Sequence, residues 1–397
     1  MTTPPASPEH MTDPAHPRPD ARKEQIATML AAGDPLADAV TAELDHYGTP
    51  ARQALETGLR QGLTGLAERP PRAVATLLEE VESATAQENP LKLRRGDVVS
   101  MSVPPMWFGL CSVTSALAQS YSSPATARVV AGGGTSTARA TCRLSATGVW
   151  ARQVMRPGGL LRGAPGYVAT VGLRLRHARM RAASLTDWDR GTPGLPVGQL
   201  DLTRTWLGFT FTSFQALAMV GVGLSTEQEH DLYAYWSHVG RLLGIDERLR
   251  AAVNEHADAR RLLDLLRATT AGPDENSTAL TAALVDAQAR ATAAAPGVVL
   301  SEAHLCDVIH GLLRRALGDD TANRLNIPAA SAARLTPLIR TLDRQARHTR
   351  TGIPASSPTG GGRTSQEPGS APTVATLPLD VTSGSNACVD HPNAPAA

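Results

Sequence analysis

The chain has 397 residues, of which 38 are lysine or arginine and 37 are aspartate or glutamate, so its formal net charge is +1. Balanced charge, with no basic stripe interleaved with aromatic residues, argues against a dedicated nucleic-acid-binding protein. The cysteines are scattered and form no CxxC pair, which excludes the common zinc spacings and the CxxCH attachment of covalent haem. They are Cys111, Cys142, Cys306 and Cys388.

Residues 1–25 contain no apolar segment of the kind that directs export, so we expect a cytoplasmic protein. Two stretches, 98–127 and 205–226, carry no charge. The first contains Pro104-Pro105, and both contain many Ser, Thr and Gln residues. These interruptions predict buried helices of a soluble core, with no membrane span.

Helix-start signals recur along the chain. Asp34-Pro35 and Thr49-Pro50 place proline at the first helical position, and Ser225 followed by Gln228 has the spacing of a capping box. No convincing period-two strand is present. Periodicity predicts helices over 21–32, 35–47, 50–68, 71–87, 98–122, 136–156, 166–185, 199–221, 226–244, 247–270, 276–294, 300–318 and 329–350.

These elements predict an all-α fold, with one large helical domain over 21–350. Residues 1–20 and the Pro/Gly/Ser-rich residues 351–397 have compositions that cannot support a packed core, so we predict that both segments are disordered.

The helix predicted over 166–185 carries a single histidine, His177. At about 100° per residue, Val171 and Leu175 belong to an apolar stripe, while His177 lies on the opposite side of the helix. Arg174 and Arg181, three residues before it and four after it, flank the imidazole. Spacing alone leaves two interpretations open, an ordinary structural histidine and the ligand of an iron whose organic cofactor carries carboxylates.

Other constellations compete for the chemistry. Glu43 with His46, and Glu227 with His230, are E-x-x-H pairs, a spacing that di-iron helical proteins use twice. The second pair lies in the first turn of its helix, where acidic residues are also expected from helix capping. Cys306 and His310 lie one turn apart without an evident third ligand, which favours core packing.

The segment before His177 carries a resemblance to a known family. Arg143 and Thr147 lie one turn apart in "RLSAT", which is followed by "RPGGLLRGAPG" and then by "RLRHARMR" around His177. Downstream come "GLPVGQLDLTRTWLGF" and "WSHVGRLLGI". Taken in this order, the motifs resemble those of the MpaB-type oxygenases and latex clearing proteins, over roughly residues 35–330.

The resemblance implies a globin-like helical core that holds non-covalent haem b and uses O2 as co-substrate. His177 would be the axial ligand of the iron. Arg174 and Arg181 would pair with the haem propionates, a role that suits the bidentate guanidinium group. Arg143 and Thr147 would line or brace the other side of the pocket.

The chain also departs from the family pattern. Rubber-cleaving members carry a lysine where this sequence has Ala146, and an upstream glutamate where it has Ala127. No glutamate occurs between Glu88 and Glu227. The expected function is therefore haem-dependent oxidation, with O2, of an apolar, unsaturated or prenylated small molecule. The sequence does not determine whether this reaction needs an electron donor and identifies none. The alternatives are a polyisoprene-cleaving dioxygenase, a haem-binding protein without turnover and a di-iron helical oxidase.

Overall fold

The computed structural model of the chain describes residues 19–188, 194–329 and 332–351. Within these ranges every regular element is a helix and no strand occurs, which confirms the predicted all-α fold. None of the helices described in these ranges is long and apolar enough to cross a membrane. The predicted segments 1–20 and 351–397 lie almost wholly outside the described residues, so the predicted domain limits stay predictions.

Twenty α-helices and four short π- or 3-10-helical segments follow one another along the chain. They are α1 (Pro19–Thr28), α2 (Pro35–Tyr47), α3 (Thr49–Gln61), η1 (Leu63–Gly65), α4 (Arg72–Ala86), α5 (Pro90–Arg95), α6 (Val98–Met101), α7 (Pro105–Trp107), η2 (Phe108–Val113), α8 (Thr114–Tyr121), α9 (Pro124–Gly132), α10 (Thr137–Met155), α11 (Pro165–Leu185), α12 (Gln199–Leu207), η3 (Gly208–Thr212), α13 (Ser213–Leu217), η4 (Ala218–Val220), α14 (Thr226–Leu242), α15 (Glu247–Arg250), α16 (His256–Thr269), α17 (Glu275–Ala293), α18 (Glu302–Leu317), α19 (Asp319–Arg324) and α20 (Ala332–Thr351).

Local capping explains several of these starts. The Asp34 carboxylate accepts a hydrogen bond from the backbone N–H of Ala37 at the start of α2, and proline follows at the first position. The capping box of α14 is formed in both directions between Ser225 and Gln228. Such contacts satisfy backbone N–H groups that have no partner within the helix.

Several of the long predicted helices are interrupted, among them 98–122, 199–221 and 247–270. The prediction of one helix over 98–122 was wrong, because Pro104 cannot donate a backbone hydrogen bond and the chain breaks into α6, α7, η2 and α8. Segments η2 and η3 are π-helical, with wider turns, and they pack against each other. In each segment, a carbonyl of the wider turn accepts a hydrogen bond from a side-chain hydroxyl five residues later in the chain. Thr114 Oγ1 donates to Gly109 O (2.8 Å), and Ser213 Oγ donates to Gly208 O (2.7 Å).

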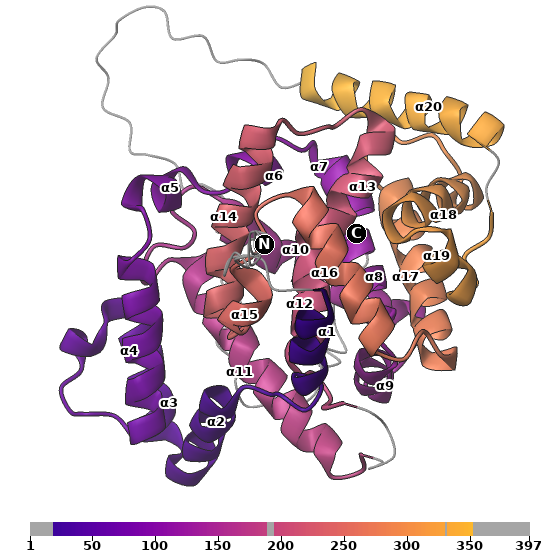
Figure 1. Ribbon diagram of the computed structural model, residues 1–397. Helices are drawn as coiled ribbons and strands as arrows, with labels where there is room; N and C mark the ends of the chain where they lie inside the picture. Colours follow the sequence, from indigo (N-terminus) through magenta and orange to yellow (C-terminus); the bar gives the residue numbers. More distant parts are fainter. Residues whose placement is uncertain (1–18, 189–193, 330–331, 352–397) are drawn as a thin grey trace, which may run out of the picture.

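The helices pack as a row with further helices laid against it. Contacts run from α4 to α2, then to α11, α10, α17 and α18. Helices α2, α3 and α4 form one flank of the molecule, and α17 to α20 form the opposite flank (Figure 1). Helices α10 and α11 therefore lie in the interior, where α8, α9 and α12 complete the walls around them.

Buried ion pairs fix α11 against α2. Arg174, whose side chain is 4% exposed, donates from Nε and Nη2 to Asp34 (2.5 and 3.0 Å) and from Nη1 to Glu80 (2.7 Å). Arg181, 2% exposed, pairs with Asp38 at 2.6 Å. A buried guanidinium group is stable only while its carboxylate partners stay in place, so these contacts set the position of the whole helix.

This packing predicts a large stability difference between two conservative substitutions. Asp34→Asn removes the charge that compensates buried Arg174 and should lower the free energy of unfolding by about 3–5 kcal/mol. Asp45→Asn is the matched control, because Asp45 pairs with Arg179 but is 58% exposed, and it should cost less than about 1 kcal/mol. Urea unfolding followed by circular dichroism measures both. Equal, small losses would show that Glu80 alone is sufficient for Arg174.

Candidate active site

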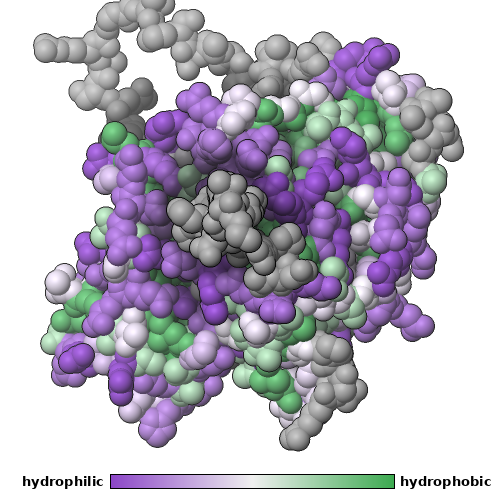
Figure 2. All heavy atoms as spheres, viewed as in Figure 1, coloured by the Kyte–Doolittle hydropathy of each residue, from purple (hydrophilic) through white to green (hydrophobic). Residues whose placement is uncertain are grey.

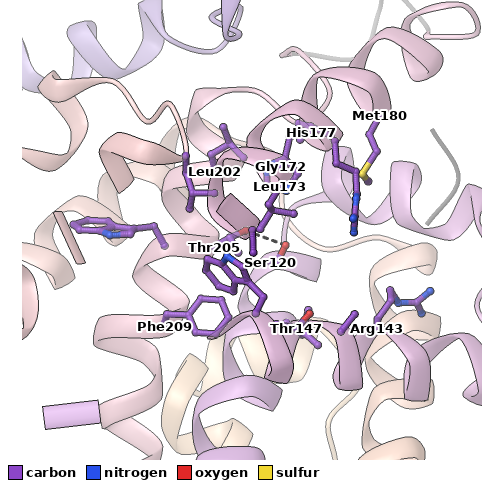
Figure 3. Close-up of a pocket in the computed structure, with 18 of the residues that line it drawn as sticks. Ser120, Arg143, Thr147, Gly172, Leu173, His177, Met180, Leu202, Thr205 and Phe209 are labelled. Carbon is purple, nitrogen blue, oxygen red and sulfur yellow. Dashed lines mark hydrogen bonds between the residues drawn. The ribbon is translucent and has the colours of Figure 1, made fainter. Parts of the chain in front are cut away.

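A largely apolar cavity lies between α10 and α11 and is completed by α8, α9, α12, η3 and α14. Helix α11 contributes Gly172, Leu173, His177 and Met180, and α10 contributes Arg143 and Thr147 from the opposite side (Figure 3). These six residues come from two segments that the sequence motifs had already singled out. The structure thus brings three predicted site residues, Arg143, Thr147 and His177, to one cavity.

His177 points from α11 into the cavity, toward the face of α10 that carries Arg143 (Figure 3). Its buried Nδ1 atom has no hydrogen-bond partner, and within the described chain its ring makes no hydrogen bond. Burial lowers the pKa of His177 from 6.5 to about 3, aided by the charges of Arg176 and Arg181 and opposed by Asp34. The imidazole is therefore neutral at physiological pH, which is the form that binds a metal.

Arg143 and Thr147 are one turn apart on α10. The Arg143 side chain is almost fully buried. Its guanidinium group donates from Nε to the hydroxyl of Tyr121 (3.2 Å) and from Nη1 to Gly134 O (3.1 Å). Its buried Nη2 atom has no partner within the described chain. A buried cationic donor without a partner is costly for a folded protein, so this side of the cavity suits an anionic or strongly polar group of a ligand.

The structure corrects the expectation for Arg174 and Arg181. Neither side chain lines the cavity, and both are directed to the other side of α11, where carboxylates of α2 and α4 already engage them. The remaining donor of Arg181, Nη1, is bound to the carbonyl of Val197 at 2.7 Å. These arginines hold the helix in place. Their donor groups are engaged by acceptors of the protein, so we do not propose that they pair with haem propionates.

Ala146 lines the cavity between Arg143 and Thr147. The position at which rubber-cleaving members carry a lysine therefore faces this cavity. Ala127 of α9 is fully buried, and its neighbours Thr126 and Val130 line the cavity. The wall here is built by methyl, hydroxyl and aliphatic groups in place of an amine and a carboxylate.

Aromatic side chains close another part of the cavity. Phe209 from the π-helical segment η3 stacks on Trp236, with ring centroids 5.3 Å apart, and meets Trp150 edge-on at 5.3 Å. The indole N–H groups point away to fixed acceptors: Trp150 Nε1 donates to Thr170 Oγ1 (3.2 Å) and Trp236 Nε1 to Asp97 Oδ2 (2.6 Å). The rings thus present apolar faces to the cavity.

Sequence reasoning assigned no role to Asp201, although it is the aspartate of the quoted "LDLTRT" segment. Asp201 lines the cavity from α12, and its Oδ1 accepts a hydrogen bond from Ser123 Oγ (2.6 Å). Burial raises its pKa above the ordinary 3.8, although Ser123, Arg204 and Thr126 oppose the shift. The position of Asp201 within a family motif was the available sequence signal for a role at the site. Its raised pKa could not be predicted, because that shift depends on burial, which only the fold determines.

The competing metal constellations are not assembled. No group of three or more His, Cys, Asp or Glu side chains in metal-binding proximity occurs among the described residues, which include both E-x-x-H pairs and the Cys306–His310 pair. The Glu43 carboxylate instead accepts the backbone N–H groups of Ala73 and Val74 at the start of α4. This glutamate has a capping function.

The comparisons with known proteins define the class of this all-helical fold, whose central apolar cavity carries a histidine. Residues 100–350 match the family described as ER-bound oxygenase mpaB/B'/Rubber oxygenase, catalytic domain. The chain belongs to this family. A structure titled "Structure of Latex Clearing Protein LCP in the closed state" is similar to this chain with a TM-score of 0.59 and 19% identity, over 83% of this chain and 86% of that one. No curated protein sequence matches the chain.

The buried carboxyl of Asp201 predicts a particular dependence of stability on pH. Because its pKa is raised on folding, the folded chain holds a proton that the unfolded chain releases above about pH 3.8. This contribution to stability is therefore present below that pH and is lost as the pH rises through the folded pKa. Asp201→Asn should remove this pH-dependent loss of stability. The free energy of unfolding of the variant, relative to that of the wild type, should therefore increase from about pH 4 to about pH 7, as measured by urea unfolding.

Ser123→Ala is the control for the Asp201 prediction. It removes the hydroxyl donor and leaves the carboxyl in place, at a cost of about 1 kcal/mol at both pH values. An unchanged pH dependence in Asp201→Asn would show that folding does not raise the pKa of this carboxyl.

Proposed function

We propose that the chain is a haem b-dependent oxygenase that uses O2 to oxidise an apolar, unsaturated or prenylated small molecule. Membership of the oxygenase family supports the reaction class. The observation that carries the haem assignment is His177, a neutral imidazole whose Nδ1 has no partner, in the wall of a mainly apolar cavity. Haem iron, when bound, would supply the oxygen chemistry, while the protein supplies ligation, orientation and a dry site.

The residues of the cavity fit this cofactor. His177 would ligate the iron, because its lone pair is available and its proton is lost well below neutral pH. Arg143 would donate from Nη2 to a carboxylate of the cofactor or to a polar atom of the substrate, and Thr147 offers a hydroxyl one turn away. The stacked Phe209 and Trp236 rings would hold an apolar substrate and exclude water.

Asp201 would be the proton-transfer group of the cavity. Burial raises the pKa of its carboxyl, and the hydrogen bond from Ser123 Oγ fixes the orientation of the group. With Ala146 and Ala127 at the positions of the family's lysine and glutamate, Asp201 is the carboxyl of the cavity lining that can give or accept a proton. An electron donor, if the reaction needs one, would act from outside the cavity.

Replacing the proposed ligand tests the cofactor assignment. His177→Ala should leave a folded helical protein that loses most of its haem, because the iron would have lost its bond to the chain. The measurement is the Soret absorbance per protein, with pigment identification by extraction. His310→Ala, on α18 outside the cavity lining, is the matched control and should keep the wild-type spectrum.

The outcomes of this experiment also separate the alternatives. Full haem retention with an unchanged spectrum in His177→Ala would contradict the assignment. Two irons without a Soret band, lost in His46→Ala or His230→Ala, would support the di-iron interpretation. Haem binding without O2 consumption for any apolar substrate tried would favour a haem protein without turnover.

A second prediction concerns the substrate. We expect little or no cleavage of polyisoprene, because the cavity wall carries the methyl group of Ala146 where rubber-cleaving members have lysine and offers no glutamate. Haem-loaded protein is incubated with latex emulsion under air, and carbonyl-ended oligoisoprenoids are measured beside a latex clearing protein as positive control. Abundant oligomers would show that neither group is required and would favour the polyisoprene-cleaving alternative.

A further inference from the structure

Exposed apolar side chains gather on one small part of the surface. Among the large apolar side chains of the described residues, Leu91 (67% exposed), Val98 (51%) and Met101 (47%) lie within eleven consecutive positions on α5 and α6. The other exposed ones, Tyr47, Leu185 and Val299, are scattered singly, which is normal for a protein surface. The cluster on α5 and α6 therefore calls for a physical explanation.

Basic residues share this surface. Arg94 and Arg95 lie three and four positions after Leu91, so the three side chains project from one face of α5, and Val98 and Met101 share one face of α6. We call these five residues the α5–α6 face. Figure 2 shows hydrophilic and apolar residues side by side over α5, at the upper left of the molecule.

The arginines of this surface have no acidic or hydrogen-bonding partner within the described chain. No hydrogen bond or ion pair within the described chain engages the exposed guanidinium groups of Arg94, Arg95 or the neighbouring Arg156, whose backbone packs against Gly96. Lys92, by contrast, is turned inward to Glu88 and to the carbonyl of Ala234. Asp231 of α14 lines the adjoining hollow together with the buried Asp97, and Glu88 is paired with Lys92, so the three unpaired arginines leave the surface positive.

The α5–α6 face also adjoins the active-site cavity. A hollow between α5, α6 and α14 is lined by Leu91, Val98 and Asp97. The Asp97 carboxylate accepts the hydrogen bond from Trp236 Nε1 (2.6 Å), and the Trp236 ring lines the cavity. The Asp97–Trp236 hydrogen bond thus links a residue that lines the hollow to a residue that lines the cavity.

We propose that the α5–α6 face docks the protein on the surface of an anionic lipid membrane. Apolar side chains that project beside unpaired arginines match the boundary between acyl chains and anionic headgroups, where each group meets its preferred surroundings. A second copy of the chain would present the same positive charge and would be repelled. An apolar substrate would then reach the cavity from the membrane, a consequence that rests on the proposed function, whereas the docking requires only this face.

The test is flotation of the full-length protein with lipid vesicles. It should bind vesicles of phosphatidylcholine mixed with phosphatidylserine, bind vesicles of phosphatidylcholine alone much more weakly, and dissociate as salt is added. Each arginine near an anionic surface contributes roughly fivefold in affinity, so Arg94→Glu/Arg95→Glu should weaken binding by at least about 25-fold. Leu91→Ser/Met101→Ser should weaken it by about tenfold or more.

Matched controls make the same chemical changes elsewhere. Arg69→Glu/Arg315→Glu has the same change in net charge, and Leu185→Ser/Val299→Ser removes exposed apolar groups of similar size. Both controls should keep wild-type binding. All the substituted residues are exposed, so circular dichroism should show wild-type folding in every variant.

Three results would overturn the proposal. The first is equal binding of the wild type to neutral and anionic vesicles, and the second is loss of binding in the controls to the same extent as in the face variants. The third is no vesicle binding together with a dimer that Leu91→Ser/Met101→Ser abolishes, which would make the face an interface between copies. Vesicle binding is measured with His177→Ala as well. Docking that survives haem loss separates this proposal from the proposed function.

Discussion

The position of α11 depends on charge buried on one of its sides, and the cavity depends on α11. Arg174 and Arg181 are almost fully buried, and the carboxylates that compensate them come from α2 and α4. A guanidinium group in low dielectric cannot move away from its partners without a large penalty, so the helix is held in register and rotation. His177, on the opposite side, can then face a cavity without any hydrogen bond of its own to orient it.

The cavity is shaped by two departures from regular helix geometry as well. The π-helical segments η2 and η3 widen two buried helices where they touch, and η3 places Phe209 against Trp236 and Trp150. A π-helical turn leaves carbonyl groups with poorer backbone geometry, and the Thr114 and Ser213 hydroxyls supply additional donors there. The result is an apolar lining with few polar groups. Asp201 is held by its hydrogen bond from Ser123, and Arg143 keeps one donor, Nη2, without a partner in the described chain.

Much of the helical content followed from periodicity and capping, because Asp34-Pro35 and the Ser225–Gln228 pair act within one turn of the chain. Arg143, Thr147 and His177 could be selected because their motifs are local. The roles of Arg174 and Arg181 could not, since Asp34 is 140 positions from Arg174 and Asp38 is 143 from Arg181. Flanking arginines on a helix look the same in sequence whether they serve a cofactor or a distant carboxylate. The break in 98–122 had a local signal in Pro104, whereas the π-helical widening within 199–221 was missed because tertiary packing decides where a long apolar helix widens.

Asp97 joins the α5–α6 face to the wall of the cavity. It caps α6 by accepting a hydrogen bond from the backbone N–H of Ser100 (3.0 Å), and its Oδ2 accepts a hydrogen bond from the indole N–H of Trp236. Burial raises the pKa of this carboxyl, against the hydrogen bonds from Ser100 and Trp236. The same side chain therefore ends one helix of the exposed apolar and basic face and fixes one aromatic wall of the cavity. The 2.6 Å hydrogen bond therefore joins the first turn of α6 directly to a ring that lines the cavity, so the α5–α6 face and this part of the cavity wall share one buried contact.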